Sequence, residues 1–346
     1  MIKKIVLLSA LLLILFSAGI IYLVQKPLQA PVGQDVISLQ INQGQTLSAL
    51  AYSWQQQGWL PSARLLLLQA KLFNSAKHIK PGEYDVPENT NMLQLLTLLT
   101  KGSNKRYRVS FIEGTQLKDA LLSLANAEKL IQDVQPLTVA KVQTLLQLDK
   151  LPEGLIYPDT YVYQSGDSVS SILQQSHQRL QKVLNEEWQA YESAQGKKLP
   201  YQSAYEALVM ASIVEKETGQ AHERPEIAGV FIRRLQKNMR LETDPTVIYG
   251  LGESFDGNLR KKHLRDRSNP YNTYRNKGLP PTPIALAGRE AIHAALNPDA
   301  GQSLYFVAKG DGSHYFSTSL EEHNRAVRKY QIFRRSKEYR SAPAIN

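Results

Sequence analysis

The hydrophobic positions of the chain begin with an uncharged run at the N-terminus. Residues 5–24 contain no charged side chain, and Lys3 and Lys4 precede them. A helix of that length spans about 30 Å, the thickness of the hydrocarbon core of a bilayer. The run therefore predicts a transmembrane anchor, with residues 1–4 in the cytoplasm and the remainder outside. The alternative is a cleaved signal peptide with Ala30 at the cut.

The pattern changes to short alternating and helical segments after a linker at residues 25–36. Ile37, Leu39 and Ile41 alternate with polar residues, as they do in a half-buried strand. Apolar residues at helical spacing follow them. Together these signals predict a small α+β module over residues 37–103, with a strand at 37–41, helices from about residue 47, at 62–73 and at 92–99, and a second strand at 83–86.

Residues 104–340 carry the pattern of a second, larger α+β domain, whose core is expected at residues 200–335. Amphipathic helices dominate it, and alternating segments indicate short strands. The predicted elements are a strand at 106–112, helices at 117–127, 139–146, 168–192, 203–219 and 227–235, a hairpin that joins 303–308 to 314–317, and a basic helix that begins near residue 321. The fold class is therefore predicted to be α+β, with a transmembrane helix ahead of two folded domains.

One of these helices, at residues 203–219, has clear boundaries in the sequence. Ser203 and Glu206 form an S-x-x-E pattern, which is typical of a capping box at a helix start. Gly219 stands where a left-handed residue would end the helix. The sequence therefore predicts one helix from Ser203 to Gly219.

A single carboxylate lies in line with the apolar face of this helix. Met210, Ile213 and Val214 share that face by their spacing. Glu217 follows on the same face, whereas Glu215 lies about 200° around the axis. Two acids placed so cannot act as a facing pair, and the spacing singles out Glu217.

The expected surroundings of Glu217 favour its neutral form. A carboxyl group on an apolar face is partly desolvated, and a negative charge in the last turn opposes the helix dipole. A Glu that stays protonated near neutral pH is what a general acid for glycosidic bond cleavage requires. The competing interpretation is a solvated surface charge in a Glu-Lys-Glu run, since most charged residues are exposed.

Composition narrows the class of chemistry. The chain has 346 residues, no cysteine and a net charge of +10. The lack of cysteine excludes disulfides, thiol catalysis and cysteine-based metal sites. The positive charge suits an acidic polymer or an anionic membrane surface, or simply solubility. Apart from a basic run at 260–267, the positive charge is dispersed along the chain. This dispersion does not favour nucleic acid as the partner.

A run of unusual residues at 241–250 follows the helix, with an Asp before a Pro, a β-branched run and then Gly. Two loop segments of fixed shape come after it, at residues 269–274 and 278–284. The first of these two segments contains a Tyr-Asn-x-Tyr pattern, which combines flat apolar rings with an amide, as sugar binding requires. His222 and Glu223 begin like a zinc-binding H-E-x-x-H motif, but Glu226 stands at its last position. No metal and no cofactor are expected.

Five sequence blocks give the chain a specific resemblance. In order and approximate spacing they are similar to the MltG/YceG family of endolytic murein transglycosylases, and with the N-terminal anchor the resemblance covers nearly the whole chain. The small module also resembles a LysM module in its G-x-T-L opening at residues 44–47; such modules bind polymers that contain N-acetylglucosamine. The five blocks are ASIVEKET (211–218), TDPTVIYG (243–250), YNTY (271–274), GLPP-x-PI (278–284), and YFVA with H-x-F-x-T-x-x-x-x-H (305–323).

The resemblance implies site residues and a reaction. The second Glu of the E-K-E run is the family's catalytic acid/base, and this position is Glu217. The other blocks imply a substrate groove lined by Asp244, Tyr271, Asn272 and His314. Two positions depart from the family pattern: Glu242 stands where Gln is common and Thr282 where Gly is common.

The implied reaction cleaves the bond between N-acetylmuramic acid and N-acetylglucosamine within nascent glycan strands. It leaves a 1,6-anhydro-muramyl end and so limits strand length. Only one carboxylate is needed, because the nucleophile is the sugar's own C6 hydroxyl, whereas an ordinary glycosidase uses two. Three alternatives remain: a non-catalytic glycan-binding scaffold, a metal-dependent hydrolase, and a hydrolytic muramidase with Asp244 as the second carboxylate.

The resemblance also implies location and partners. The catalytic domain is expected on the periplasmic face of the inner membrane, held by a single-pass anchor. Its partners would be peptidoglycan strands and, nearby, penicillin-binding proteins that polymerise glycan.

Overall fold

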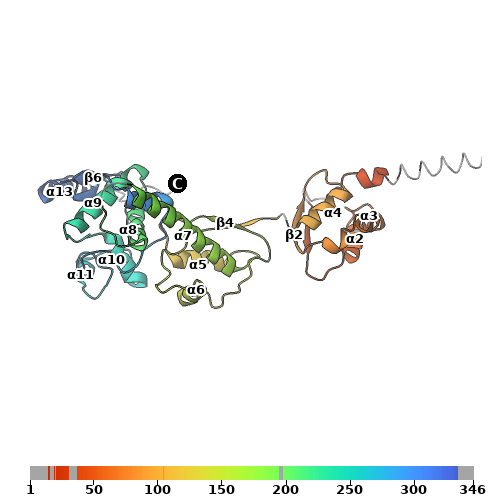
Figure 1. Cartoon of the computed structure of the whole chain (residues 1–346), viewed down its shortest axis with the longest axis horizontal. Coiled ribbons are helices and arrows are strands. Elements are labelled where there is room, and N and C mark those ends of the chain that lie inside the picture. Colours follow the sequence, from red (N-terminus) through yellow and green to blue (C-terminus); the bar gives the residue numbers. More distant parts are fainter. Residues whose placement is uncertain are drawn as a thin grey trace, which may run out of the picture. The chain divides into compact units, whose positions relative to one another are not determined.

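The computed structural model describes residues 15, 19, 21–30, 37–103, 105–194 and 198–333 (Figure 1). Most of the predicted anchor at residues 5–24 lies outside these residues. Within the described ranges, no helix is both long and apolar enough to cross a bilayer. The chain divides into two compact units. The first holds the described residues up to Arg108 together with Glu128–Ile131 and Val162–Asp167, and the second holds the rest.

The first unit is built on a two-stranded antiparallel sheet. Strands β1 (Ile37–Ile41) and β2 (Gly82–Val86) pair so that Ile37 faces Val86 and Ile41 faces Gly82. Three helices complete the unit, and capping side chains mark their starts, because each accepts a backbone N–H of the first turn. These helices are α2 (Leu47–Gln56, capped by Thr46), α3 (Ala63–Leu72, capped by Ser62) and α4 (Met92–Lys101, capped by Asn91). The predicted order of elements in this module is confirmed.

A buried carboxylate ties a distant segment to this unit. Glu83 on β2 is buried, and its oxygens lie 3.6 Å from Lys105 Nζ and 3.3 Å from Lys129 Nζ. The hydroxyl of Tyr107 also donates to it. A buried charge must be compensated in this way, because an unpaired one costs several kcal/mol, on the order of 3–5. The ion pair to Lys129 explains why Glu128–Ile131 belongs to the first unit.

The second unit is organised around helix α8 (Ala204–Glu217), which is buried on all sides rather than along one stripe. All eight residues from 207 to 214 are buried. The helices packed against α8 are α7 (Val169–Ser193), α9 (Arg224–Gln236), α10 (Asp244–Leu251) and α12 (Arg289–Leu296).

Shorter elements complete the two units (Figure 1). Strands β5 and β6 form the predicted hairpin, with Ala308 opposite His314. Strands β3 and β4 form a second two-stranded sheet. The remaining bounds are β3 (Tyr107–Ser110), α5 (Leu117–Ala125), α6 (Val139–Leu145), β4 (Thr160–Tyr163), α11 (Lys261–Arg265), β5 (Tyr305–Ala308), β6 (His314–Ser317), α13 (Leu320–Val327) and a π-helical segment (Arg328–Phe333), with short 3-10 helices at Ala76–His78, Ala221–Glu223 and Gly252–Ser254.

Both ends of α8 differ in detail from the prediction. The Ser203 hydroxyl accepts the N–H of Glu206, as expected, but the Glu206 carboxylate accepts the N–H of Gln202 instead of closing the capping box. The helix ends at Glu217, where Thr218 adopts an extended backbone. The predicted left-handed ending at Gly219 is therefore wrong, because a buried Thr218 turns the chain first.

One buried hydroxyl fastens α8 to the loop at residues 278–284. Ser212 Oγ accepts the N–H of Ile284 at 3.0 Å and donates to the carbonyl of Val209 at 2.7 Å. Both Ser212 and Ile284 are buried. The loop therefore has a fixed position relative to the end of the helix.

We expect Ser212→Ala to destabilise the protein by about 1–3 kcal/mol, because the buried N–H of Ile284 loses its hydrogen bond to Ser212 Oγ. Calorimetric unfolding should show a melting temperature several degrees lower than that of the wild type. Ser193→Ala is the matched control. The Ser193 hydroxyl also donates to a carbonyl of its own helix, that of Gln189 at 2.8 Å, but Ser193 is exposed. Equal melting temperatures for the two variants would contradict this role of Ser212.

Candidate active site

Glu217 is the last residue of α8, where the buried middle of the helix gives way to a partly open surface. Its side chain is partly buried, and its Oε1 accepts a hydrogen bond from the hydroxyl of Thr243. Thr243 directly precedes α10. The candidate acid is thus held between the end of one helix and the start of another.

The surroundings of Glu217 change its acidity as the sequence predicts. Burial is the largest cause and raises the pKa of Glu217 to about 7, and the charge of Asp244 acts in the same direction. The Thr243 hydroxyl opposes both, because it donates to the charged form. The group is therefore partly protonated at neutral pH, as a general acid must be.

Thr243 is held in place by its own neighbours. Its N–H donates to Thr273 Oγ1 at 3.1 Å, and its carbonyl accepts from Thr246 Oγ1 at 2.8 Å. The preceding residue, Glu242, adopts a left-handed backbone with φ of 53°, which is uncommon for a residue with a side chain. Arg234 stabilises that conformation, since its Nη1 lies 3.3 Å from the Glu242 carboxylate.

Asp244 lies beside the acid and is exposed. Its Oδ1 accepts a hydrogen bond of 2.7 Å from the Tyr274 hydroxyl. Burial and the charge of Asp244 raise the pKa of Tyr274 well above its usual range, so this phenol remains a donor. Of the four groove residues that the resemblance implies, Asp244 has the clearest connection to Glu217.

Tyr271 and Asn272 have different surroundings in the loop between α11 and α12. Tyr271 is half-buried, packs edge-on against Tyr249 with ring centroids 4.8 Å apart, and shares a hydrogen bond of 2.9 Å with Thr282. Asn272 is fully buried, and its amide bonds to the backbone of its own and the preceding loop. Its side chain shapes these loops from inside.

His314 is buried in a polar network that reaches the residue after Glu217. Its N–H and Nδ1 lie 2.8 and 2.7 Å from the two carboxylate oxygens of Glu223. Glu223 also accepts from the Thr218 hydroxyl at 3.3 Å. His314 therefore acts on the site through Glu223 and Thr218, and its own ring is enclosed.

Glu215 has a different function from Glu217 although only one residue separates them. Its carboxylate accepts the N–H of Gly288 at 3.0 Å and lies 3.6 Å from Arg224, and its side chain is 6% exposed. Burial raises its pKa as well. These contacts join α8 to the starts of α9 and α12, so Glu215 is a structural group.

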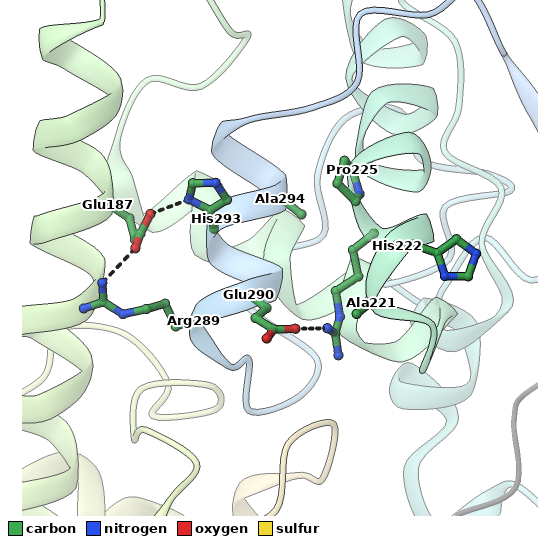
Figure 2. Close-up of a pocket in the computed structure, with 9 residues that line it drawn as sticks. Glu187, Ala221, His222, Pro225, Arg289, Glu290, His293 and Ala294 are labelled. Atoms are coloured by element: carbon green, nitrogen blue, oxygen red, sulfur yellow. Dashed lines mark hydrogen bonds and ion pairs between the residues drawn. The ribbon is translucent and has the colours of Figure 1, made fainter.

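A pocket of about 530 Å³ opens between α7, α9 and α12. Figure 2 shows Glu187 on its wall holding Arg289 and His293, at 3.0 and 2.9 Å. Glu290 on α12 pairs with Arg224, which also contacts Glu215. The residues lining this pocket do not include Glu217, and the acids on its walls already compensate the cations.

Across the described ranges, no group of three or more His, Cys, Asp and Glu side chains is arranged to hold a metal ion. Glu223, the acid of the partial H-E-x-x-H motif, is instead occupied by His314 and Thr218.

Sequence reasoning missed Thr243, Tyr274 and Glu223. Thr243 precedes Asp244 and Tyr274 lies two positions after Asn272, so both fall within the sequence blocks that were singled out. Glu223 was considered only as a metal-site residue. No spacing signal could reveal its partner, because His314 lies 91 residues away.

Comparisons with known proteins identify the family of the chain. Residues 39–329 match the model of the YceG-like family. A protein named endolytic murein transglycosylase from Bacillus subtilis is 31% identical over 340 residues, covering 89% of each chain. One of the same name from Streptococcus pneumoniae is 26% identical over 84% of this chain, which spans only 58% of that protein.

A solved structure of a YceG-like protein has a similar fold. The crystal structure of a putative YceG-like protein from Listeria monocytogenes matches with a TM-score of 0.53 and 28% identity, over 84% of this chain and 98% of that one. The mixed α+β architecture is thus that of solved YceG-like proteins. The match over residues 39–329, together with the Bacillus relative, shows that this chain belongs to the YceG-like family.

Proposed function

We propose that the chain is an endolytic murein lytic transglycosylase whose acid/base is Glu217. The observation that carries the proposal is the enclosed carboxyl group with a pKa of about 7 at the end of α8. The names of the relatives from Bacillus and Streptococcus support the reaction class. The substrate is the bond between N-acetylmuramic acid and N-acetylglucosamine within nascent strands.

In the first step, neutral Glu217 donates its proton to the glycosidic oxygen, the C1–O bond breaks, and an oxocarbenium-like centre develops at muramyl C1. Burial keeps the proton on Glu217 before the reaction. The Thr243 hydroxyl donates to the carboxylate that forms and so stabilises the charge that appears as the proton leaves.

In the second step, the Glu217 carboxylate takes the proton of the muramyl C6 hydroxyl, whose oxygen bonds to C1. The product is a 1,6-anhydro-muramyl end, and Glu217 is again protonated. Because the nucleophile belongs to the substrate, no second carboxylate has to activate water. The structural role of Glu215 is consistent with a single working acid.

Asp244 gives one specific reason to keep a second candidate reaction. Its charge acts on Glu217, and it is exposed beside the acid. A second carboxylate in that place could activate water and give hydrolysis with a reducing end. The binding of Tyr274 to Asp244 favours a positioning role instead, since it occupies one carboxylate oxygen.

The proposal extends to the rest of the chain. Residues 5–24 would anchor the enzyme in the inner membrane, with the catalytic unit in the periplasm. Glycan-polymerising penicillin-binding proteins would be its neighbours there, and co-purification would test this.

The module at residues 37–103 would bind N-acetylglucosamine polymers as LysM modules do. Oligomers of that sugar added to isotopically labelled protein should shift NMR signals of that module, and unshifted signals there would refute its binding role.

Glu217→Gln should abolish cleavage, with a loss of about 10²- to 10⁴-fold or more, because the amide cannot donate the proton. The assay is mass spectrometry of products from uncrosslinked murein strands. The folding of Glu217→Gln is compared with that of Glu215→Gln. Anhydro-muramyl ends made by the wild type and missing with Glu217→Gln are expected. Reducing ends, one water heavier, would move the proposal to hydrolysis with Asp244.

The pH dependence should follow Glu217. The acid must be protonated in the free enzyme, so kcat/KM should fall as pH rises through about 7. Asp244→Asn removes a charge that raises the pKa, and the alkaline limb should move to lower pH. Thr243→Val removes a bond that lowers the pKa, and the limb should move to higher pH. Shifts in the same direction for both variants would contradict the assignment.

Removal of residues 1–24 should move the protein from the membrane fraction to the soluble fraction of lysed cells. The catalytic activity per molecule on dissolved strands should stay unchanged, because the site lies wholly in the second unit. A truncated protein that stays with the membranes would contradict the anchor.

A further inference from the structure

The cations of the second unit differ in whether a carboxylate compensates them. Arg224, Arg233, Arg234 and Arg289, which support the core helices, each lie within 4.0 Å of one. A second set lies at residues 260–267, which we name the basic arm. It carries five cations and one carboxylate: Arg260, Lys261, Lys262, Arg265, Arg267 and Asp266.

Most of the basic arm is uncompensated. Arg260 pairs with Asp256 at 2.6 Å. The other four cations have no carboxylate within 4.0 Å in the part of the chain that the structure describes, and all four are exposed. Asp266 is turned to Ser268, whose N–H and hydroxyl it accepts at 2.8 and 2.6 Å. Like charges held so close repel, and an anionic ligand would relieve this.

The arm also has a shape that a ligand group can enter. Lys262, His263, Arg265 and Asp266 line an open hollow of about 610 Å³. Two of these side chains are cations without a partner, so the hollow presents positive charge to whatever enters it.

The backbone of the basic arm is fastened to the loop that carries the site. The Asn272 amide donates to the carbonyls of His263 and Asp266, at 3.1 and 2.6 Å. Its oxygen accepts the N–H of Tyr274 at 3.0 Å, and the Tyr274 hydroxyl in turn bonds to Asp244 beside Glu217. One buried side chain thus fixes the arm relative to the site.

We propose that the basic arm binds the carboxylates of the peptide stems that branch from the glycan strand being cut. Each muramyl residue of murein carries a short peptide with free carboxylates, so stems come next to every cleavable bond. Exposed cations on an arm that Asn272 fastens to the Tyr274 loop would hold a stem without contacting the sugar ring. This inference rests on the proposed function and adds a preference for strands that still carry stems.

The test compares two double variants on two substrates. Lys261→Glu with Lys262→Glu reverses two charges of the arm, and Lys118→Glu with Lys141→Glu reverses two exposed charges on α5 and α6. The substrates are uncrosslinked strands with stems and the same strands after an amidase has removed them. Binding is also measured by sedimentation in the Glu217→Gln background, where no cleavage occurs.

On stem-bearing strands at low salt, the arm variant should raise KM about five- to tenfold with kcat unchanged, since two attractive contacts become repulsive. The control variant should leave KM unchanged. On stemless strands the two variants should behave alike, and salt of about 0.5 M should remove the difference, because it screens exposed charges. Sedimentation should show the same ranking.

Several results would overturn the inference. Equal KM values for both variants on stem-bearing strands would do so, as would an equal loss on stemless strands. If the arm variant lost binding to vesicles of anionic phospholipid but still bound stem-bearing strands, the arm would be assigned to a membrane surface instead. Wild-type protein that binds stems through the arm but cuts neither substrate would refute the proposed function alone.

Discussion

The hydrogen bond from the Thr243 hydroxyl to Glu217 joins the end of α8 to the start of α10, and the proposed chemistry depends on it. It lies beside a carboxyl group whose pKa burial raises from 4.5 to about 7. That shift corresponds to about 3 kcal/mol. The folded protein keeps a proton that the unfolded chain releases in this range, so the stability contribution of Glu217 falls as pH rises from 4.5 to 7. The surrounding fold has to offset that cost.

The fold offsets it by fixing α8 from all sides. Residues 207–214 are buried, Ser212 holds the loop that contains Ile284, and Glu215 holds the starts of α9 and α12 through Gly288 and Arg224. These contacts fix the end of α8 that carries Glu217. In the proposed mechanism the two acids have separate roles: Glu215 joins helices and Glu217 transfers the proton.

Local patterns in the sequence predicted most of the elements. Alternation and helical spacing gave β1, β2, α2, α3, α4 and the β5–β6 hairpin, because each depends on neighbours in sequence. The same spacing singled out Glu217. Helices α10 and α12 were not predicted. In α10, Asp-Pro followed by β-branched residues suggests a break, whereas the structure uses Pro245 in its first turn, where proline is tolerated.

The supporting residues of the site could not be predicted in the same way. Thr243 meets Glu217 across 26 residues, and His314 meets Glu223 across 91. Asn272 and His314 were expected along a groove, yet both are buried and bond to Tyr274 and Glu223. The family blocks contain the candidate residues, but only the packing of buried polar groups assigns each residue its contact.

The proposed mechanism depends most directly on the acidity of one group. A carbon-13 NMR titration of the Glu217 carboxyl, assigned by the loss of its signal in Glu217→Gln, would measure its pKa in the absence of substrate. The enclosed carboxyl group should titrate with a midpoint near 7. A midpoint near 4.5, the ordinary value for a solvated glutamate, would show that the carboxyl group is not enclosed and would contradict its assignment as the proton donor.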